Sequence, residues 1–167
     1  MVRMSILIMP AKREEIGVVE NLARFYIYDM SEFMGWRCPE TGLFGGCDEF
    51  FDDWRAGTNS PFVLRVEGEL AGFAGVKAAD VNGRPGHCIQ EFFILRKFRR
   101  RGLGKAAAEA LFRRFPGPWL VEQLARNVAA QAFWRAVVAD YTSGEFTTLE
   151  YMHPAWGRMA SICFAGG

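Results

Sequence analysis

Residues 91–108 read EFFILRKFRRRGLGKAAA, and this stretch of the sequence is the most informative about the fold. Phe92 to Leu95 is a short apolar run of residues that favour strands. From Leu103 onwards the residues favour a helix, with apolar side chains recurring on one face, and Pro116-Gly117-Pro118 ends that helix. The stretch therefore predicts a strand, a basic turn and the first turns of a helix.

The basic turn has an unusual composition for a helix start. Helices usually begin with Ser, Thr, Asp or Asn, and acidic residues suit the positive end of the helix dipole. Here residues 99–101 are all arginine and Lys105 follows, and each such charge costs about 0.3–1 kcal/mol at an exposed helix start. A bound phosphate would reverse that cost, and Gly102 and Gly104 would let the backbone approach it closely. We expect a pyrophosphate site; the alternative is a solvated basic turn whose glycines serve backbone geometry.

Two phosphate-binding motifs match this turn poorly. A P-loop needs G-x-x-x-x-G-K-[ST], and Gly104-Lys105-Ala106 has neither the spacing nor the hydroxyl. Residues 102–107 satisfy the dinucleotide fingerprint G-x-G-x-x-A, and Glu122 lies where a ribose-binding acid is expected. However, the first glycine of that fingerprint should follow its strand closely, whereas residues 96–101 intervene here. The dinucleotide interpretation is therefore the weaker alternative.

A third motif, R-x-x-G-x-G, is formed by Arg99, Gly102 and Gly104 after an apolar strand. It resembles the acyl-CoA-binding motif of the GNAT superfamily of N-acyltransferases, in which the backbone N–H groups of this loop hold the CoA pyrophosphate. Residues 127–134 resemble the second motif of that family, N-x-x-A-x-x-[FL]-Y. The resemblance covers residues 91–115 and 127–134 as sequence motif and nearly the whole chain as architecture.

The order of the expected elements agrees with that architecture. Strands are expected at 5–9, 61–66, 71–79, 87–95, 119–124, 145–152 and 158–164, and helices at 12–30, 47–56, from 103 to the stop at Pro116, and 127–140. An antiparallel meander that enters one βα crossover disfavours a doubly wound parallel sheet, and with it the dinucleotide interpretation. We expect one α+β (mixed α/β) domain over residues 1–167, with a GNAT-like, mostly antiparallel twisted sheet of about seven strands flanked by helices.

The composition of the chain argues against several classes of ligand and binding partner. The net charge of +1 gives no support to nucleic-acid binding. The four cysteines and two histidines show no zinc-ligand spacing, so we expect no metal. No apolar run approaches the length of a membrane span, and the apolar run at Met1 to Met9 is too short for a signal peptide. We expect a cytoplasmic protein with no membrane partner, and a homodimer is compatible with the family although the sequence does not require one.

Glu91 is the candidate catalytic residue. It lies in an apolar strand, where loss of water would raise its pKa toward neutrality and suit it to accept a proton. The resemblance implies the same role, because in many GNAT proteins an acid in this strand takes the proton of the acceptor amine. The implied activity is direct transfer of an acetyl group from acetyl-CoA to an amine. In the structural alternative, Glu91 faces solvent or pairs with an arginine.

The resemblance also implies a set of cofactor-binding residues: Phe93, Ile94, Leu95, Arg99, Arg100, Arg101, Gly102, Leu103, Gly104, Lys105, Asn127, Phe133 and Trp134. Asn127 is equally suited to cap the helix that follows, in which Ala129, Phe133, Ala136 and Val137 are expected to face inward. Trp134 departs from the family, because it replaces a tyrosine that can protonate the leaving thiolate. We expect Trp134 to pack either against the pantetheine or acyl group or in the core. The replacement donor would be one of Tyr26, Tyr28, Tyr141 and Tyr151.

An acidic, aromatic stretch from Asp29 to Asp53 precedes the hairpin predicted from the strands at 61–66 and 71–79. In GNAT proteins the acceptor enters at this place. The candidate acceptor-binding residues are Tyr26, Tyr28, Asp29 and Glu32, which would attract a small cationic amine. A solvated acidic face is the alternative. For the whole chain, the alternative function is a non-catalytic acyl-CoA- or nucleotide-binding module that has lost its proton donor.

Overall fold

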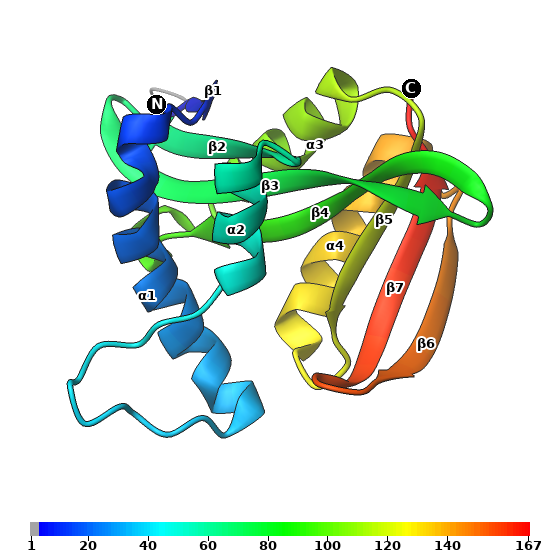
Figure 1. The fold of residues 1–167 in the computed structure, drawn as a ribbon. Helices are drawn as coiled ribbons and strands as arrows, with labels where there is room; N and C mark the ends of the chain where they lie inside the picture. The colour runs from blue at the N-terminus through cyan, green and yellow to red at the C-terminus, as the bar shows by residue number, and fades with distance from the viewer. Residues whose placement is uncertain (1–3) are drawn as a thin grey trace. The chain divides into compact units, whose positions relative to one another are not determined.

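The computed structural model describes residues 4–167 (Figure 1). Its strands are β1 (Ile6–Pro10), β2 (Asn59–Val66), β3 (Glu69–Val81), β4 (Arg84–Ile94), β5 (Pro118–Leu124), β6 (Thr147–His153) and β7 (Gly157–Ala165). Its helices are α1 (Ile16–Met34), α2 (Asp48–Ala56), α3 (Leu103–Arg114) and α4 (Val128–Thr142), with short 3-10 turns η1 (Arg13–Glu15) and η2 (Arg96–Phe98).

The described strands form one sheet in the order β1-β2-β3-β4-β5-β7-β6. β1 pairs antiparallel with β2, and β7 pairs antiparallel with both β5 and β6. β4 and β5 are parallel, with His87 opposite Trp119. The predicted fold class, a mostly antiparallel sheet of about seven strands with flanking helices, is therefore confirmed.

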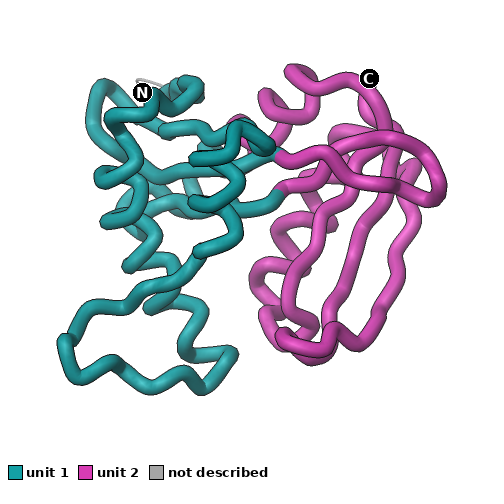
Figure 2. Tube along the Cα trace, in the orientation of Figure 1, with its two compact units in different colours: residues 1–76, 90–104 teal, residues 77–89, 105–167 magenta. Residues whose placement is uncertain are grey.

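The chain forms two compact units (Figure 2). The first comprises the described residues up to Val76 together with Gln90–Gly104, and the second comprises Lys77–Ile89 together with Lys105–Gly167. Strands β3 and β4 and helix α3 each run through both units, so neither unit is a single continuous segment of the chain. The single domain expected over residues 1–167 stays a prediction.

The core of the first unit joins α1 and α2 to β2, β3 and β4. Its buried members are apolar and largely aromatic: Val19, Leu22, Ala23, Phe50, Phe51, Trp54, Val63, Phe73 and Phe93. The predicted first helix begins as the 3-10 turn η1 and continues as α1 to Met34, four residues further than expected. Residues 31–34 contain no Gly or Pro, and the helix ends at Gly35, which explains the extra turn. The aromatic residues of α2 are buried in this core, whereas residues 35–43 of the acidic stretch form an exposed loop.

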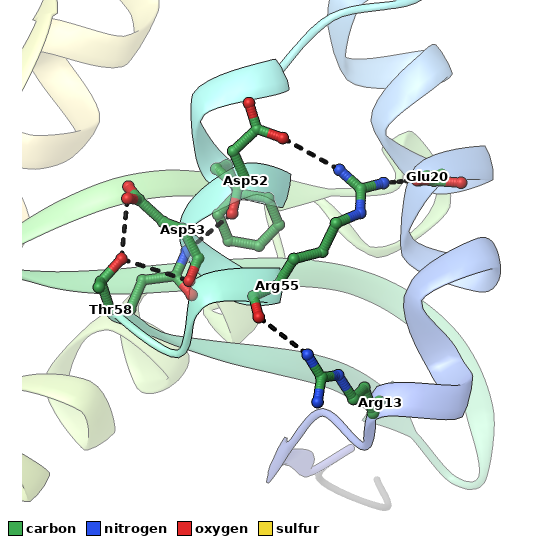
Figure 3. Close-up of polar contacts among 8 residues, drawn as sticks. Arg13, Glu20, Asp52, Asp53, Arg55 and Thr58 are labelled. Carbon is green, nitrogen blue, oxygen red and sulfur yellow. Dashed lines mark hydrogen bonds and ion pairs between the residues drawn. The ribbon is translucent and has the colours of Figure 1, made fainter.

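Arg55 joins α2 to α1 on the surface of the first unit (Figure 3). Its guanidinium contacts the carboxylates of Glu20, at 2.8 Å, and Asp52, at 3.2 Å, and its carbonyl accepts a hydrogen bond from Arg13. These side chains are exposed, so each pair contributes at most about 1 kcal/mol.

The second unit has an aromatic core centred on Phe112, a fully buried residue of α3. Its ring lies 5.0 Å from Trp119, 4.9 Å from Phe164 and 6.5 Å from Trp134, measured between ring centroids. The predicted inward face of α4 is only partly correct. Ala129 and Ala136 are exposed and Phe133 is half-buried, whereas the buried residues are Trp134, Val137 and Val138. Apolar residues occur on almost every side of α4, so the periodicity of its sequence could not identify the buried face. The largest side chain of the helix, the indole of Trp134, is among those that are buried.

No helix among residues 4–167 has both the length and the apolar character that crossing a membrane requires. In the same residues, no group of three or more His, Cys, Asp or Glu side chains is placed to hold a metal ion.

Candidate active site

The basic turn lies between η2 and α3, and its backbone is open to an anion. Arg100 (φ 59) and Gly102 (φ 75) both have left-handed backbone conformations, so the chain bends sharply at each. The amides of residues 100–104 donate no hydrogen bond to an acceptor within residues 4–167, and no acidic residue stands in the first turn of α3. Unpaired amides at a helix start form a binding place for phosphate oxygens. The turn therefore fits a pyrophosphate.

Two arginines of this segment, Arg96 and Arg99, form ion pairs with Asp29 near the end of α1. Arg96 Nη2 lies 2.7 Å from Asp29 Oδ1, and Arg99 Nη2 lies 2.7 Å from Asp29 Oδ2. Arg99 also donates from Nε to the Ile94 carbonyl, and its guanidinium lies 5.5 Å from the centre of the Phe93 ring. The Arg99 side chain thus holds the turn against α1 and β4. Arg100 and Arg101 are exposed, and they are the cations of the turn best placed to meet a phosphate.

The apolar members of the predicted cofactor set are mostly buried. Phe93, Ile94 and Leu103 belong to the core, and Leu95 is half-buried. Any contact of the three buried residues with a cofactor would come from their main chain. In the second unit, the Lys105 ammonium pairs with Asp140 and lies 3.8 Å from Glu109.

The second family motif also serves the structure of the second unit. Asn127 caps α4, because its Oδ1 accepts a hydrogen bond from the Ala130 amide at 3.0 Å. Trp134 is 6% exposed and packs 4.9 Å from the ring of Phe133. This placement agrees with core packing, the alternative left open for Trp134 by the sequence. The family's tyrosine position is therefore filled by a buried indole.

Glu91 of β4 is the centre of the polar site in the first unit. It is half-buried as a residue, and it lies near Tyr26 of α1 and Cys47, which precedes α2. Burial raises the pKa of Glu91 to about 7; hydrogen bonding by the Tyr26 and Cys47 side chains lowers this pKa, and the charge of Glu49 raises it. The expected rise of this pKa toward neutrality is confirmed. Such a carboxyl can accept a proton and release it near neutral pH.

A second polar side chain lies beside Glu91. Gln90 donates from Nε2 to Asp53 of α2 at 2.7 Å and accepts a hydrogen bond from Asn59 at 2.9 Å. Through these bonds Gln90 joins β4 to α2 and to β2.

The four tyrosines have different surroundings. Tyr26 contacts Glu91, whereas Tyr28 is 57% exposed and packs against Phe44. In the second unit, Tyr141 packs in the aromatic core and Tyr151 donates a hydrogen bond to Glu122. The fourth candidate for acceptor binding, Glu32, is exposed on α1.

Sequence reasoning missed Cys47, Gln90 and Asp53. Cys47 follows Gly45-Gly46 at the first residue of a predicted short helix, and this is the one local signal that could have pointed to it. No local pattern marks Gln90 or Asp53, because their importance comes from contacts between distant segments.

Comparisons with known proteins agree with this fold. A model of the Acetyltransferase (GNAT) family matches residues 27–137. The structure of an acetyltransferase from Thermus thermophilus is 16% identical, with a TM-score of 0.69 and 99% of each chain covered. A GNAT family acetyltransferase from Streptococcus agalactiae is 17% identical, with a TM-score of 0.68 and coverage of 97% of this chain and 96% of that chain.

A third solved structure is AAC(6')-Ib in complex with Ribostamycin and Coenzyme A. It is 13% identical, with a TM-score of 0.65 and coverage of 96% of this chain and 93% of that chain. A search of curated proteins found no match to this sequence. The structural likenesses show the fold, and the family model spans more than half of the sequence, so the chain belongs to the GNAT acetyltransferase family.

Proposed function

We propose that this chain is an N-acetyltransferase that moves the acetyl group of acetyl-CoA directly to the amine of a small cationic acceptor. The observation that carries the proposal is Glu91, a carboxyl group withdrawn from water with a pKa of about 7 in the strand that leads to the basic turn. An amine must lose a proton before it can attack a carbonyl carbon, and this carboxyl is suited to take it.

Acetyl-CoA supplies the acetyl group as a thioester: the amine nitrogen bonds to the acetyl carbon, the carbon–sulfur bond breaks, and the amine proton passes to Glu91. The thiol of CoA, with a pKa near 8.5, leaves as thiolate at pH 7.5 at a cost of only about 1.4 kcal/mol. The reaction therefore tolerates Trp134 at the position where the family has a tyrosine. The open amides of residues 100–104 and the exposed Arg100 and Arg101 support a CoA pyrophosphate at the turn. The neighbour solved with Coenzyme A agrees with this choice of cofactor.

The acceptor is proposed to be cationic because exposed acids lie near Glu91. Asp48 and Glu49 begin α2 and are exposed, and the charge of Glu49 acts on Glu91. These carboxylates would attract an ammonium group, and the complex of one neighbour with ribostamycin suggests a class of acceptor to test. Asp29 has a different role from the one expected at first, because Arg96 and Arg99 occupy its carboxylate. A cytoplasmic location and a homodimer stay predictions from the sequence.

The test is release of CoA thiol from acetyl-CoA over a panel of small amines, peptides and aminoglycosides. We expect turnover with at least one cationic amine, and stabilisation by acetyl-CoA but not by NADH in thermal unfolding, worth about 2.7 kcal/mol at 100 times the Kd. Stabilisation by acetyl-CoA without turnover on any acceptor would favour the non-catalytic binding module. Stabilisation by NADH alone would remove the cofactor assignment.

Substituting Asp29→Asn tests its role as an anchor of the basic turn. Loss of the two pairs with Arg96 and Arg99 should raise the KM for acetyl-CoA by roughly three- to tenfold, which matches about 1 kcal/mol for partly exposed ion pairs. The KM for the amine should not change. The matched control is Glu14→Gln in η1, just before the same helix, whose side chain is exposed and has no assigned role. Initial rates with each substrate varied in turn would measure both constants, and a raised amine KM in Asp29→Asn would instead support acceptor binding.

A further inference from the structure

The second unit contains a hollow between helix α4 and the strands β5, β6 and β7. Its volume is about 280 Å³. Figure 1 shows α4 running alongside β5 and β7, and the helix contacts both strands. The residues that define this α4 hollow include Gln123, Gln131, Arg135, Thr148, Glu150 and Ile162. None of the residues that line it belongs to the predicted catalytic, cofactor-binding or acceptor-binding sets, so it is a separate candidate site.

The pairing of the strands brings the sheet side of the α4 hollow together. Residues directly opposite each other in an antiparallel pair point to the same face of a sheet. Ala160 of β7 is opposite Gln123 of β5 and also opposite Glu150 of β6. The short side chain of Ala160 therefore lies between two longer polar side chains. Ile162 is on the same face two residues further along, so the floor of the hollow is apolar and its two sides are polar.

Gln123 is the buried polar residue of this face. It is 8% exposed, and its side-chain oxygen Oε1 accepts no hydrogen bond from any group in residues 4–167. Buried polar atoms nearly always have a hydrogen-bond partner, and a buried acceptor without one destabilises the fold. A leucine at this place in β5 would pack without that penalty, so packing alone does not explain a glutamine. A ligand that satisfies Oε1 must supply an N–H or O–H donor.

Charged side chains stand at the rim of the α4 hollow. Gln131 and Arg135 lie four residues apart on α4, and hence on one face of the helix. Arg135 is exposed, and its guanidinium forms no ion pair with another residue of the described chain. Glu150 lies 3.5 Å from Arg158 through Oε2, and its other oxygen takes no part in that exposed and therefore weak pair. The hollow thus offers acceptors on its sheet side and a cation on its helix side.

We propose that the α4 hollow binds a free α-amino acid in its zwitterionic form. The ammonium group donates hydrogen bonds to Gln123 Oε1 and to the carboxylate of Glu150, and the carboxylate of the ligand pairs with the guanidinium of Arg135. A ligand that carried one charge only would leave one side of the hollow unmatched. The volume of about 280 Å³ is just below the roughly 300–1,000 Å³ of sites for drug-sized ligands, which suits a molecule as small as an amino acid.

Isothermal titration calorimetry of the full chain with each of the standard amino acids tests the proposal. We expect at least one of them to bind with a Kd in the millimolar range or below. Acetate and ethylammonium each carry one of the two charges, so each should bind at least about tenfold more weakly than that amino acid. If no amino acid binds, or if acetate alone binds as tightly, the proposal is wrong.

Substitutions at the rim test the two charges separately. Arg135→Gln should weaken the amino acid about tenfold or more by removing the partner of its carboxylate, and Glu150→Gln should weaken it similarly at the ammonium end. The matched controls are Arg113→Gln in α3 and Glu145→Gln before β6, which change exposed residues of the second unit outside the hollow. Both controls should keep the affinity of the unchanged protein. Equal affinities in Arg135→Gln and Arg113→Gln would overturn the proposal.

Gln123→Leu should change binding and stability in opposite directions. The amino acid should bind about tenfold more weakly, because the acceptor of its ammonium group is lost. Without ligand, the unfolding temperature should stay the same or rise, because the variant no longer buries an oxygen without a partner. A lower unfolding temperature with unchanged affinity would show a purely structural glutamine. Because Arg135 and Glu150 are exposed, their variants decide the question even if Gln123→Leu does not fold.

An amino acid also carries an amine, so binding as an acceptor at Glu91 has to be distinguished from binding in the α4 hollow. In nitrogen-15 NMR, the amide signals of residues 148–150 and 160–162 should shift as the amino acid is added, and Glu91→Gln should bind it with unchanged affinity. Binding that is lost in Glu91→Gln but kept in Arg135→Gln would overturn the proposal. Neither measurement uses acetyl-CoA, so failure of the proposed acetyl transfer would leave this result in place.

Discussion

Replacing Glu91 by glutamine is expected to lower kcat/KM by about 10²–10⁴-fold, the usual contribution of a positioned general base. Glutamine keeps the size of the side chain and can still accept a hydrogen bond, but it cannot take a proton from the amine. Because burial raises the pKa of Glu91 to about 7, the base is ionised and active above that pH. The rate should therefore rise with pH through about 7 in the unchanged protein, and Glu91→Gln should lose this rise. Initial rates between pH 5.5 and 9 would measure both effects.

The matched control is Glu69→Gln, which makes the same chemical change at the start of β3. Glu69 is exposed and pairs with the ammonium of Lys97, so its loss should leave kcat/KM within a factor of about two. Acetyl-CoA should stabilise both variants as it stabilises the unchanged protein, since neither residue lies in the basic turn. A Glu91→Gln variant that retains more than a third of the activity would show that another group accepts the proton.

The elements of the fold could be predicted where the determining information is local. Asn82-Gly83 gives the turn between β3 and β4, Asn127 caps α4, and the Pro116 to Pro118 stop ends α3. The buried face of α4 could not be predicted, because apolar residues occur on almost every side of that helix. In the structure Trp134 of that helix packs near Phe112 of α3, a contact between distant segments that no local pattern shows.

Glu91 is the part of the candidate site whose properties could be predicted from the sequence. Glu91 was identified because an acid within an apolar strand is unusual in itself, and the prediction that its pKa is raised is confirmed. Tyr26 and Cys47, which act on this pKa, come from distant segments, and no sequence pattern places either of them beside Glu91. Charge patterning also could not show how Asp29 is paired. The sequence shows an acid in an acidic stretch, whereas the structure pairs it with Arg96 and Arg99 of the basic turn.

Replacing Gly72 by alanine is expected to destabilise the protein by at least about 3 kcal/mol, at the upper end of the cost of overpacking. A β-carbon at this position in β3 would lie on the carbonyl oxygen of Phe93, 3.0 Å from its carbonyl carbon and 3.1 Å from Cα of Ile94. These are main-chain atoms of the neighbouring strand β4, so no change of rotamer can relieve the overlap. The strand must move, and Glu91 lies in it two residues before Phe93.

A shift of about 1 Å at a catalytic group can lower the rate about 10²-fold. The Gly72→Ala molecules that still fold should therefore also transfer the acetyl group more slowly. Its unfolding temperature should fall by about 6–12 °C, at about 2–4 °C for each kcal/mol in a protein of this size. The matched control is Gly17→Ala in α1, where a β-carbon meets no atom within 4 Å and alanine should gain about 0.5–1 kcal/mol. Thermal unfolding of the two variants and the unchanged protein measures these effects. If Gly72→Ala has the same unfolding temperature as the unchanged protein, β3 and β4 do not approach each other this closely. The strand that positions Glu91 would then be less constrained than the structure indicates.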